Sequence, residues 1–231
     1  MTGLEAAKAR AAHAALDEIG NGMKVGLGTG STAAHFVEAL GHRVRAGLDV
    51  ICVPTSDATR ALATEHGIRL TTLDETPDLD VTVDGADELD GRLNLLKGGG
   101  GALVREKIVA SSSRRMVVIA DHTKQVERLG KFPLPVEVVP FGVRSTSRKI
   151  DRALEWAGSP GPMTIRVRNG VPFVTDNGNL VIDCALGQIA DPEKVAAALS
   201  SVPGVVDHGL FLHLAKKAYI GTPDGVSIVA I

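Results

Sequence analysis

The sequence predicts an α/β protein in which a mostly parallel sheet carries helices on both faces and a smaller α+β domain is inserted near its end. Two observations predict this fold. Short apolar runs alternate with helical patterns from residue 4 to residue 120, an order typical of parallel sheets. After residue 130 the pattern changes to short strand-like runs, with Asn-Gly pairs at 169–170 and 177–178 that favour β-hairpin turns.

The first part of the chain supplies the elements of the parallel sheet. An Ala-rich helix is expected from Leu4 to Ile19, before the helix-stop signal Gly20-Asn21-Gly22. A second helix is expected to carry Ala33, Val37 and Leu40 on one face. Further strands are expected at 23–27, 50–53, 79–83 and 116–120, and further helices at 56–66 and 101–111.

The second part begins at the Pro-containing segment 131–135 and continues with a different set of elements. Strands are expected at 136–139, 163–167, 171–174, 180–182, 205–206, 218–220 and 226–231, with helices at 145–157 and from 191–192 onward. We therefore expect a Rossmann-like domain formed by residues 1–129 with 208–231. Residues 130–207 are expected to form a smaller α+β domain.

The bulk composition excludes several classes of protein. With 25 Lys and Arg against 27 Asp and Glu, the net charge of -2 gives no long-range attraction to nucleic acid or to a membrane surface. Aromatic residues make up 3% of the chain, too few for a base-stacking surface. Cys52 and Cys184 lie far apart in apolar runs, so we expect core residues and neither a disulfide nor a metal site. Without a signal-type or membrane-length segment, a cytoplasmic protein is expected.

Residues 26–32, Gly-Leu-Gly-Thr-Gly-Ser-Thr, join an expected strand to an expected helix. Free backbone N–H groups and the helix dipole favour an anion at such a turn, and Ser31 and Thr32 add hydroxyl donors. A dinucleotide fingerprint would need a third glycine at position 31, where this chain has Ser. The turn is thus a candidate phosphate or carboxylate site, with a merely tight strand-to-helix turn as the alternative.

Residues 84–88, Asp-Gly-Ala-Asp-Glu, come directly after an expected strand. Open α/β sheets hold their ligands at the carboxyl ends of their strands. Three carboxylates so close together repel one another unless water, a cation or a hydroxylated ligand accommodates them. The alternative is an ordinary solvated turn.

Residues 97–107, Lys-Gly-Gly-Gly-Gly-Ala-Leu-Val-Arg-Glu-Lys, place four glycines before a helix. Ordering four glycines costs conformational entropy, so the loop is expected to need close backbone approach to another group. Glu106 lies on the second turn of the helix and Lys97 just before the loop. A flexible loop followed by an ordinary charged helix is the alternative.

These three motifs, in this order, closely resemble those of the type A ribose-5-phosphate isomerases. Three further segments match the same family, at 130–137, 174–179 and 221–225, so the resemblance covers nearly the whole chain. It implies an enzyme that interconverts ribose 5-phosphate and ribulose 5-phosphate in the pentose phosphate pathway. A carboxylate would remove the proton on carbon 2 of the open-chain sugar and return it to carbon 1 through a cis-enediolate.

The resemblance also implies roles for particular residues. Glu106 is similar to the proton-transferring base of the family, and its polar surroundings are expected to be Asp84, Asp87 and Lys97. The residues expected to bind the substrate are Thr29, Gly30, Ser31, Thr32, Gly85, Ala86, Gly98, Gly99, Gly100, Lys124 and Lys8. Without the resemblance, Lys8 and Lys124 would be interpreted as solvated surface lysines.

Two other functions are compatible with the same broad fold. One is a binding module that senses a sugar phosphate, although the chain shows no DNA-reading helix pair or basic face in its first fifty residues. The other is an enzyme similar to the coenzyme A transferases, whose pattern the Asp-Gly-Ala-Asp-Glu motif does not match. The expected partner is a small sugar phosphate with no metal and no cofactor. The resemblance further implies a homodimer or a dimer of dimers, with residues 130–207 as a ferredoxin-like domain that serves as a lid or an oligomer contact.

Overall fold

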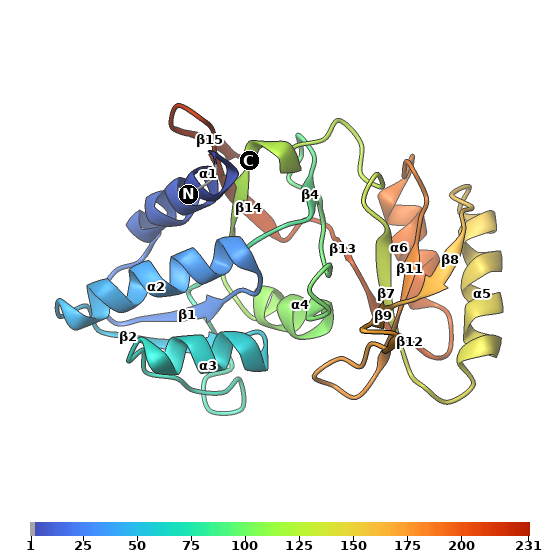
Figure 1. Ribbon diagram of the computed structural model, residues 1–231, viewed down its shortest axis with the longest axis horizontal. Coiled ribbons are helices and arrows are strands. Elements are labelled where there is room, and N and C mark those ends of the chain that lie inside the picture. Colours follow the sequence, from blue (N-terminus) through green and yellow to red (C-terminus); the bar gives the residue numbers. More distant parts are fainter. Residues whose placement is uncertain (1–2) are drawn as a thin grey trace. The chain divides into compact units, whose positions relative to one another are not determined.

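The computed structural model describes residues 3–231, which form two compact units (Figure 1). The first unit contains the chain up to Ala86 with Arg105–Gln125 and His213–Ile231, and the second contains Asp87–Val104 and Val126–Leu212. Residues 87–104, which the sequence pattern assigns to the first domain, group here with the second unit. The reason is that β5 (Leu95–Leu96) pairs with β13 (Leu210–Phe211). The domain boundaries at 129–130 and 207–208 stay a prediction.

The first unit is built on a six-stranded sheet in the order β15-β14-β6-β3-β1-β2. Its strands are β1 (Met23–Leu27), β2 (Val50–Pro54), β3 (Val81–Asp84), β6 (Met116–Asp121), β14 (Ala215–Gly221) and β15 (Val226–Ala230). Neighbouring strands run parallel, except that β14 and β15 are antiparallel. The expectation of an α/β protein with a mostly parallel sheet is confirmed.

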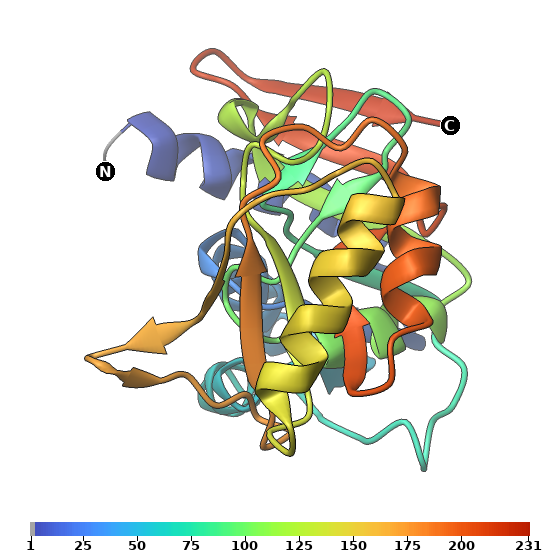
Figure 2. The same ribbon diagram turned by 90° about the vertical axis from the view of Figure 1, so that its right-hand side faces the viewer.

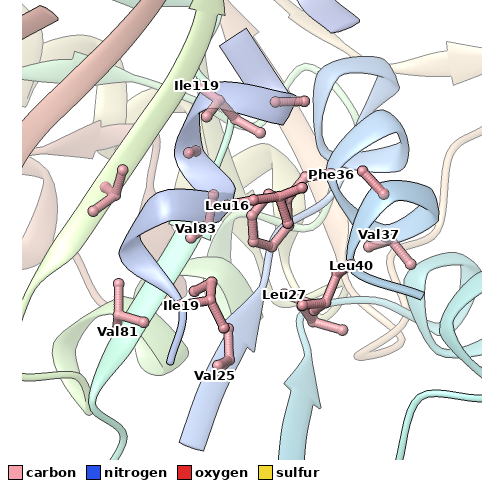
Figure 3. Close-up of a cluster of buried hydrophobic side chains, with 14 of the residues drawn as sticks. Leu16, Ile19, Val25, Leu27, Phe36, Val37, Leu40, Val81, Val83 and Ile119 are labelled. Atoms are coloured by element: carbon pink, nitrogen blue, oxygen red, sulfur yellow. The ribbon is translucent and has the colours of Figure 1, made fainter. Parts of the chain in front are cut away.

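The helices of this unit follow the expected pattern and build its core. They are α1 (Gly3–Ala15), α2 (Ser31–Arg45), α3 (Asp57–Glu65) and α4 (Leu103–Ser111), the last of which begins in the second unit. Figure 3 shows Phe36 of α2 and Leu16, which directly follows α1, packed against the strand residues Val25, Leu27 and Val83. Phe36 has no exposed surface, and truncating such a side chain to Ala typically costs about 3–5 kcal/mol.

The second unit contains an antiparallel sheet in the order β12-β7-β11-β8. Its strands and helices are β7 (Leu134–Val138), α5 (Val143–Trp156), β8 (Met163–Ile165), β11 (Leu180–Cys184), α6 (Pro192–Ser200) and β12 (Val205–His208). Figure 2 shows α5 and α6 lying side by side. Ile150 and Leu154 of α5 are buried together with Val136 of β7, which explains the helical spacing of these apolar residues.

Short strands account for the differences from the expected elements. β9 (Val167–Arg168) and β10 (Val171–Pro172) form the hairpin expected at Asn169-Gly170, and both turn residues have positive φ, 54° and 79°. The sequence pattern missed β4 (Glu88–Leu89), β5 and β13, which form a small three-stranded sheet. Strands of two residues are too short to show an alternating pattern. The expected first helix is shorter, since Leu16–Glu18 form a 3₁₀ turn.

Both cysteines lie in the interior, Cys52 on β2 and Cys184 on β11. Burial raises the pKa of each thiol to about 12. They are therefore the core residues that the sequence predicts. In the described part of the chain, no helix combines the length and the apolar character needed to cross a membrane.

Candidate active site

Asp84 lies at the carboxyl end of β3, next to the loop that follows β1. The registers place Val83 of β3 opposite Leu27 of β1, so the two loops leave the same edge of the sheet. The Asp84 side chain has no exposed surface, and its Oδ1 accepts hydrogen bonds from the backbone N–H of Thr29 at 3.1 Å and of Gly85 at 2.7 Å. A buried carboxylate thus fixes the backbone of the loop expected to bind the substrate.

Gly28 is where the two loops come closest. A Cβ atom added there would lie 2.1 Å from Asp84 Oδ1 and 2.5 Å from Asp84 Cα. Real Cβ atoms do not tolerate such distances, so position 28 must be glycine for Asp84 to keep its place. This close approach explains one of the glycines in the Gly-Thr-Gly-Ser-Thr motif.

The hydroxyl of Thr29 serves the loop itself. Its Oγ1 lies 2.7 Å from Thr55 Oγ1, 2.9 Å from Ser56 Oγ and 3.1 Å from Thr59 Oγ1. Thr59 Oγ1 in turn donates to the carbonyl of Gly28 at 2.9 Å. The sequence pattern did not single out these three hydroxyl residues, which follow β2. Only the strand register brings them beside residue 29.

Lys8 and Ser31 meet, although 23 residues separate them in the chain. Lys8 Nζ donates to Ser31 Oγ at 3.0 Å and to Glu5 Oε1 at 2.7 Å. Hydrogen bonds from Lys8 and then from His35 hold the pKa of Glu5 below its usual value. An ammonium group therefore stands at the start of α2, where an anion would also meet the helix dipole.

The remaining expected residues of the first unit lie in or beside the loops at the same sheet edge. Gly30 precedes α2, and Thr32 lies half-buried in the first turn of that helix. Lys124 belongs to a 3₁₀ turn after β6, His122–Lys124, where the Asp121 carboxylate accepts from Thr123 N at 2.9 Å. Gly85 and Ala86 directly follow β3. The contact of Lys124 with substrate stays a prediction.

Glu106 lies in the first turn of α4, and not in the second turn as expected, because the helix begins at Leu103 instead of residue 101. Its side chain is buried, with 4% of the residue exposed. Its neighbour Arg105 donates from Nη1 to Asp57 Oδ1 at 2.9 Å, which ties α4 to the start of α3. Carboxylates are rarely so deeply buried unless they are paired or used in chemistry. The burial distinguishes Glu106 from an ordinary charged residue on a solvated helix face.

Asp87 and Lys97 belong to the second unit. The Asp87 carboxylate accepts a hydrogen bond from Gly99 N at 2.8 Å. Lys97 is 2% exposed, its Nζ lies 5.4 Å from the centroid of the Phe211 ring, and its backbone N–H donates to the carbonyl of Gly209 at 2.8 Å. An ammonium over an aromatic face is stabilised by the ring quadrupole.

The glycine loop, residues 98–101, is packed rather than loose. A Cβ on Gly99 would lie 2.7 Å from Asp87 Oδ1 and 3.0 Å from the Phe132 ring. A Cβ on Gly101, where φ is 86°, would lie 2.3 Å from the Phe173 ring. These contacts favour the expectation of close backbone approach over that of a flexible linker.

Each of the three carboxylates of residues 84–88 accepts hydrogen bonds from its own backbone N–H groups. Asp84 accepts from Thr29 and Gly85, Asp87 accepts from Gly99, and the buried Glu88 accepts from Gly130 N at 2.7 Å and Phe132 N at 2.6 Å. Backbone N–H groups thus stabilise each of the three charges. Among residues 3–231, no three His, Cys, Asp or Glu side chains form a group that could hold a metal ion.

A model of the family described as ribose 5-phosphate isomerase A (phosphoriboisomerase A) matches residues 51–225. The ribose-5-phosphate isomerase A of Rhodopseudomonas palustris (strain HaA2) is 58% identical over 223 residues, which cover 96% of each chain. This chain belongs to the ribose-5-phosphate isomerase A family. Among solved structures, the ribose 5-phosphate isomerase of Plasmodium falciparum superposes with a TM-score of 0.93 at 38% identity, over 99% of each chain.

A second solved ribose-5-phosphate isomerase, in complex with phospho-erythronic acid, superposes with a TM-score of 0.91 at 38% identity over 99% of each chain. The chain is thus an enzyme of the pentose phosphate pathway with ribose-5-phosphate isomerase activity. Membership of the ribose-5-phosphate isomerase A family decides against a sensing module and against a coenzyme A transferase, the two alternatives that the sequence left open.

Proposed function

We propose that Glu106 is the base of this isomerase, which removes the proton from carbon 2 of open-chain ribose 5-phosphate and returns it to carbon 1 through a cis-enediolate. The observation that carries the proposal is the burial of this carboxylate, 4% exposed, on the first turns of the helix that follows the glycine loop. Asp84 and Asp87 each accept backbone N–H groups that hold a loop, which suits them to positioning the substrate.

Charge stabilisation must accompany the proton transfer. A positioned base contributes about 10²–10⁴-fold, which leaves most of an enzyme's rate enhancement to other groups. We assign Lys97 and the N–H groups of Gly98, Gly99 and Gly100 to the negative oxygens of the enediolate. Each preorganised donor of this kind is worth roughly 2.7–4 kcal/mol. Asp84 and Asp87, with Gly85 and Ala86 between them, are assigned to the sugar hydroxyls and to ring opening.

The phosphate of the substrate is assigned to the loop of Thr29, Gly30, Ser31 and Thr32, with Lys8 and Lys124. The hydrogen bond of Lys8 to Ser31 and the position of both at the start of α2 support this assignment. We propose further that phospho-erythronic acid binds this chain as it binds the solved relative. Its carboxylate resembles the charge distribution of the enediolate, and its phosphate would occupy the same loop.

We also propose a fold type for each domain and an oligomeric state. The second unit has the order β7-α5-β8-β11-α6-β12 and an antiparallel sheet in which the fourth of these strands lies beside the first, which supports a ferredoxin-like domain. A Rossmann-like first domain with helices on both faces of its sheet is proposed likewise. We also propose a cytoplasmic homodimer or dimer of dimers that acts without metal or cofactor.

Isotope transfer tests the proton path. Ribose 5-phosphate labelled with deuterium on carbon 2 is converted with a chelator present, and deuterium on carbon 1 of ribulose 5-phosphate is measured by NMR. A single carboxylate predicts partial transfer, because the abstracted deuteron exchanges with solvent in competition with its return. Complete retention without exchange would indicate a hydride shift, and loss of all activity in chelator would indicate a metal. Either result would overturn the proposal.

A further inference from the structure

The glycine loop of the second unit is held by an arginine that no sequence motif marks. Arg166 lies between β8 and β9, and its Nη1 donates to the carbonyl of Gly98 at 2.8 Å and of Gly99 at 3.1 Å. The other edge of the guanidinium forms a fork with Asp183 of β11, through Nε to Oδ2 at 2.9 Å and through Nη2 to Oδ1. One side chain thus bridges a strand of the antiparallel sheet and two consecutive loop carbonyls.

The ion pair between Arg166 and Asp183 is largely buried, and the orientation of the guanidinium is fixed. The side chains of Arg166 and Asp183 are 13% and 22% exposed, so the pair is largely withdrawn from water. Asp183 orients the planar guanidinium, which leaves its remaining N–H groups aimed at the loop. A lysine could place one charge near Asp183, but it could not reproduce the fork and reach two carbonyls together.

Two peptide groups of the loop are oriented by these bonds. The peptide group between Gly98 and Gly99 is hydrogen-bonded on both sides. Its carbonyl accepts from Arg166, and its N–H donates to the Asp87 carboxylate at 2.8 Å. The next peptide, between Gly99 and Gly100, has its carbonyl on Arg166. In a trans peptide the N–H points opposite to the carbonyl. Arg166 therefore turns the Gly100 N–H away from itself, and Gly100 is exposed.

We propose that Arg166 is a positioning residue for the isomerisation, which fixes the Gly99–Gly100 peptide so that the Gly100 N–H faces the developing negative oxygen of the substrate. The inference rests on the proposed role of the glycine loop as a donor to the enediolate. Because a donor that moves by about 1 Å can lose about 10²-fold in rate, such a residue acts on turnover without touching the substrate. Asp183 acts indirectly, because it orients the guanidinium of Arg166.

The test compares Arg166→Met, Arg166→Lys and Asp183→Asn with the control Arg168→Met. Arg168 is a matched control because its guanidinium stacks on Phe173 at 4.4 Å, as that of Arg166 does at 5.9 Å, while its side chain has no hydrogen bond to the loop among the described residues. For each variant, kcat and KM are measured with ribose 5-phosphate. The melting temperature is measured alongside, and active sites are counted by titration with phospho-erythronic acid.

We expect kcat per active site to fall about 10- to 100-fold in Arg166→Met, with KM changed less than about threefold, because a transition-state donor is misplaced. In Arg166→Lys, less than half of this loss in kcat is expected to be recovered. In Asp183→Asn, kcat per active site is expected to fall about threefold to tenfold. In the control Arg168→Met, it is expected to stay within twofold of wild type. An unchanged kcat per active site with a lowered melting temperature would overturn the inference, since Arg166 would then be only a structural tie. If Arg166→Met does not fold, Asp183→Asn decides by the same criterion.

Gly99→Ala separates this inference from the proposal on which it rests. Its Cβ would meet Asp87 and Phe132, so the loop must shift whatever Arg166 does. Wild-type turnover in Gly99→Ala would overturn the role of the loop itself. A large loss in Gly99→Ala together with wild-type kcat in Arg166→Met would leave the loop in place and overturn the inference about Arg166 alone.

Discussion

The carboxylate of Asp84 occupies the space that a side chain on residue 28 would need. Because a Cβ there would also lie 2.5 Å from the Asp84 backbone, rotating the carboxylate cannot relieve the clash. We expect Gly28→Ala to move the loop or the end of β3, and to lower kcat/KM for ribose 5-phosphate about 10²-fold or more. Steady-state kinetics measure this effect. The matched control is Gly20→Ala, where the nearest atom is Met23 Cε at 3.7 Å. Equal activity of the two variants would contradict the account.

Lys8→Met tests the assignment of the phosphate to the loop before α2. The variant keeps most of the length of the side chain and removes the charge that reaches Ser31. We expect KM to rise about tenfold or more, because a hydrogen bond to a charged group contributes roughly 1.5–3 kcal/mol. The change in kcat is expected to be smaller, because the phosphate is bound equally in the ground state and in the transition state. Lys24→Met, an exposed lysine whose side chain makes no hydrogen bond among the described residues, serves as the control. A fall in kcat at constant KM would instead place Lys8 in the chemical step.

Glu137 on β7 holds the segment 175–179 from inside the second unit. It has no exposed surface, and its Oε1 accepts from Thr175 Oγ1 at 3.0 Å, Asn177 Nδ2 at 3.1 Å and Asn179 Nδ2 at 2.9 Å. We expect Glu137→Ala to lower the free energy of unfolding by about 3–5 kcal/mol, because three donors lose their acceptor in a buried place.

Urea unfolding monitored by circular dichroism measures this loss. Glu155→Ala, on the exposed face of α5, is expected to stay within about 0.5 kcal/mol of wild type. A loss below about 1 kcal/mol in Glu137→Ala would show that the network does not stabilise the fold. Two segments that match the family at 130–137 and 174–179 would then need another explanation.

Glu18 makes the first unit sensitive to acid. Burial opposes its ionisation, but hydrogen bonds from Lys217, Tyr219 and Arg115 outweigh burial and lower its pKa from 4.5 to about 2. The folded state therefore gains stability from the ionised group above pH 4.5, and loses it as the pH falls from 4.5 towards 2. After allowance for partly exposed partners, the contribution is about 2 kcal/mol.

Unfolding curves of Glu18→Gln and wild type between pH 2 and 7 test this coupling. The variant is expected to be about 2 kcal/mol less stable at pH 7, and the difference should shrink as the pH falls through the range 4.5 to 2. Asp17→Asn, whose carboxylate is exposed, is the control. A difference between Glu18→Gln and wild type that does not vary with pH would contradict the assigned pKa.

The regular elements could be predicted because their patterns are local. β1 was expected at 23–27 and is found at Met23–Leu27, since its apolar run is bounded by glycines on both sides. The loops after β1 and β3 could be placed at one sheet edge because parallel strands end together. The family motifs then identified the candidate residues within those loops.

The partners of the site residues could not be predicted, because they depend on distant parts of the chain. Nothing in the sequence around Arg166 indicates that it reaches Gly98, 68 residues away. The same holds for the separate N–H partners of Asp84, Asp87 and Glu88, which read in sequence as one acidic cluster. The small sheet of β4, β5 and β13 joins residues 88–96 to residues 210–211, which lie far apart in the chain.

The central claim is that the Glu106 carboxylate moves the proton, and Glu106→Gln tests it most directly. The substitution keeps the shape of the side chain and removes its basicity. We expect kcat for ribose 5-phosphate to fall by about 10²–10⁴-fold, while the Kd for phospho-erythronic acid, measured by calorimetry, stays within about threefold of wild type. Turnover close to that of wild type in a variant that binds the acid normally would contradict the account.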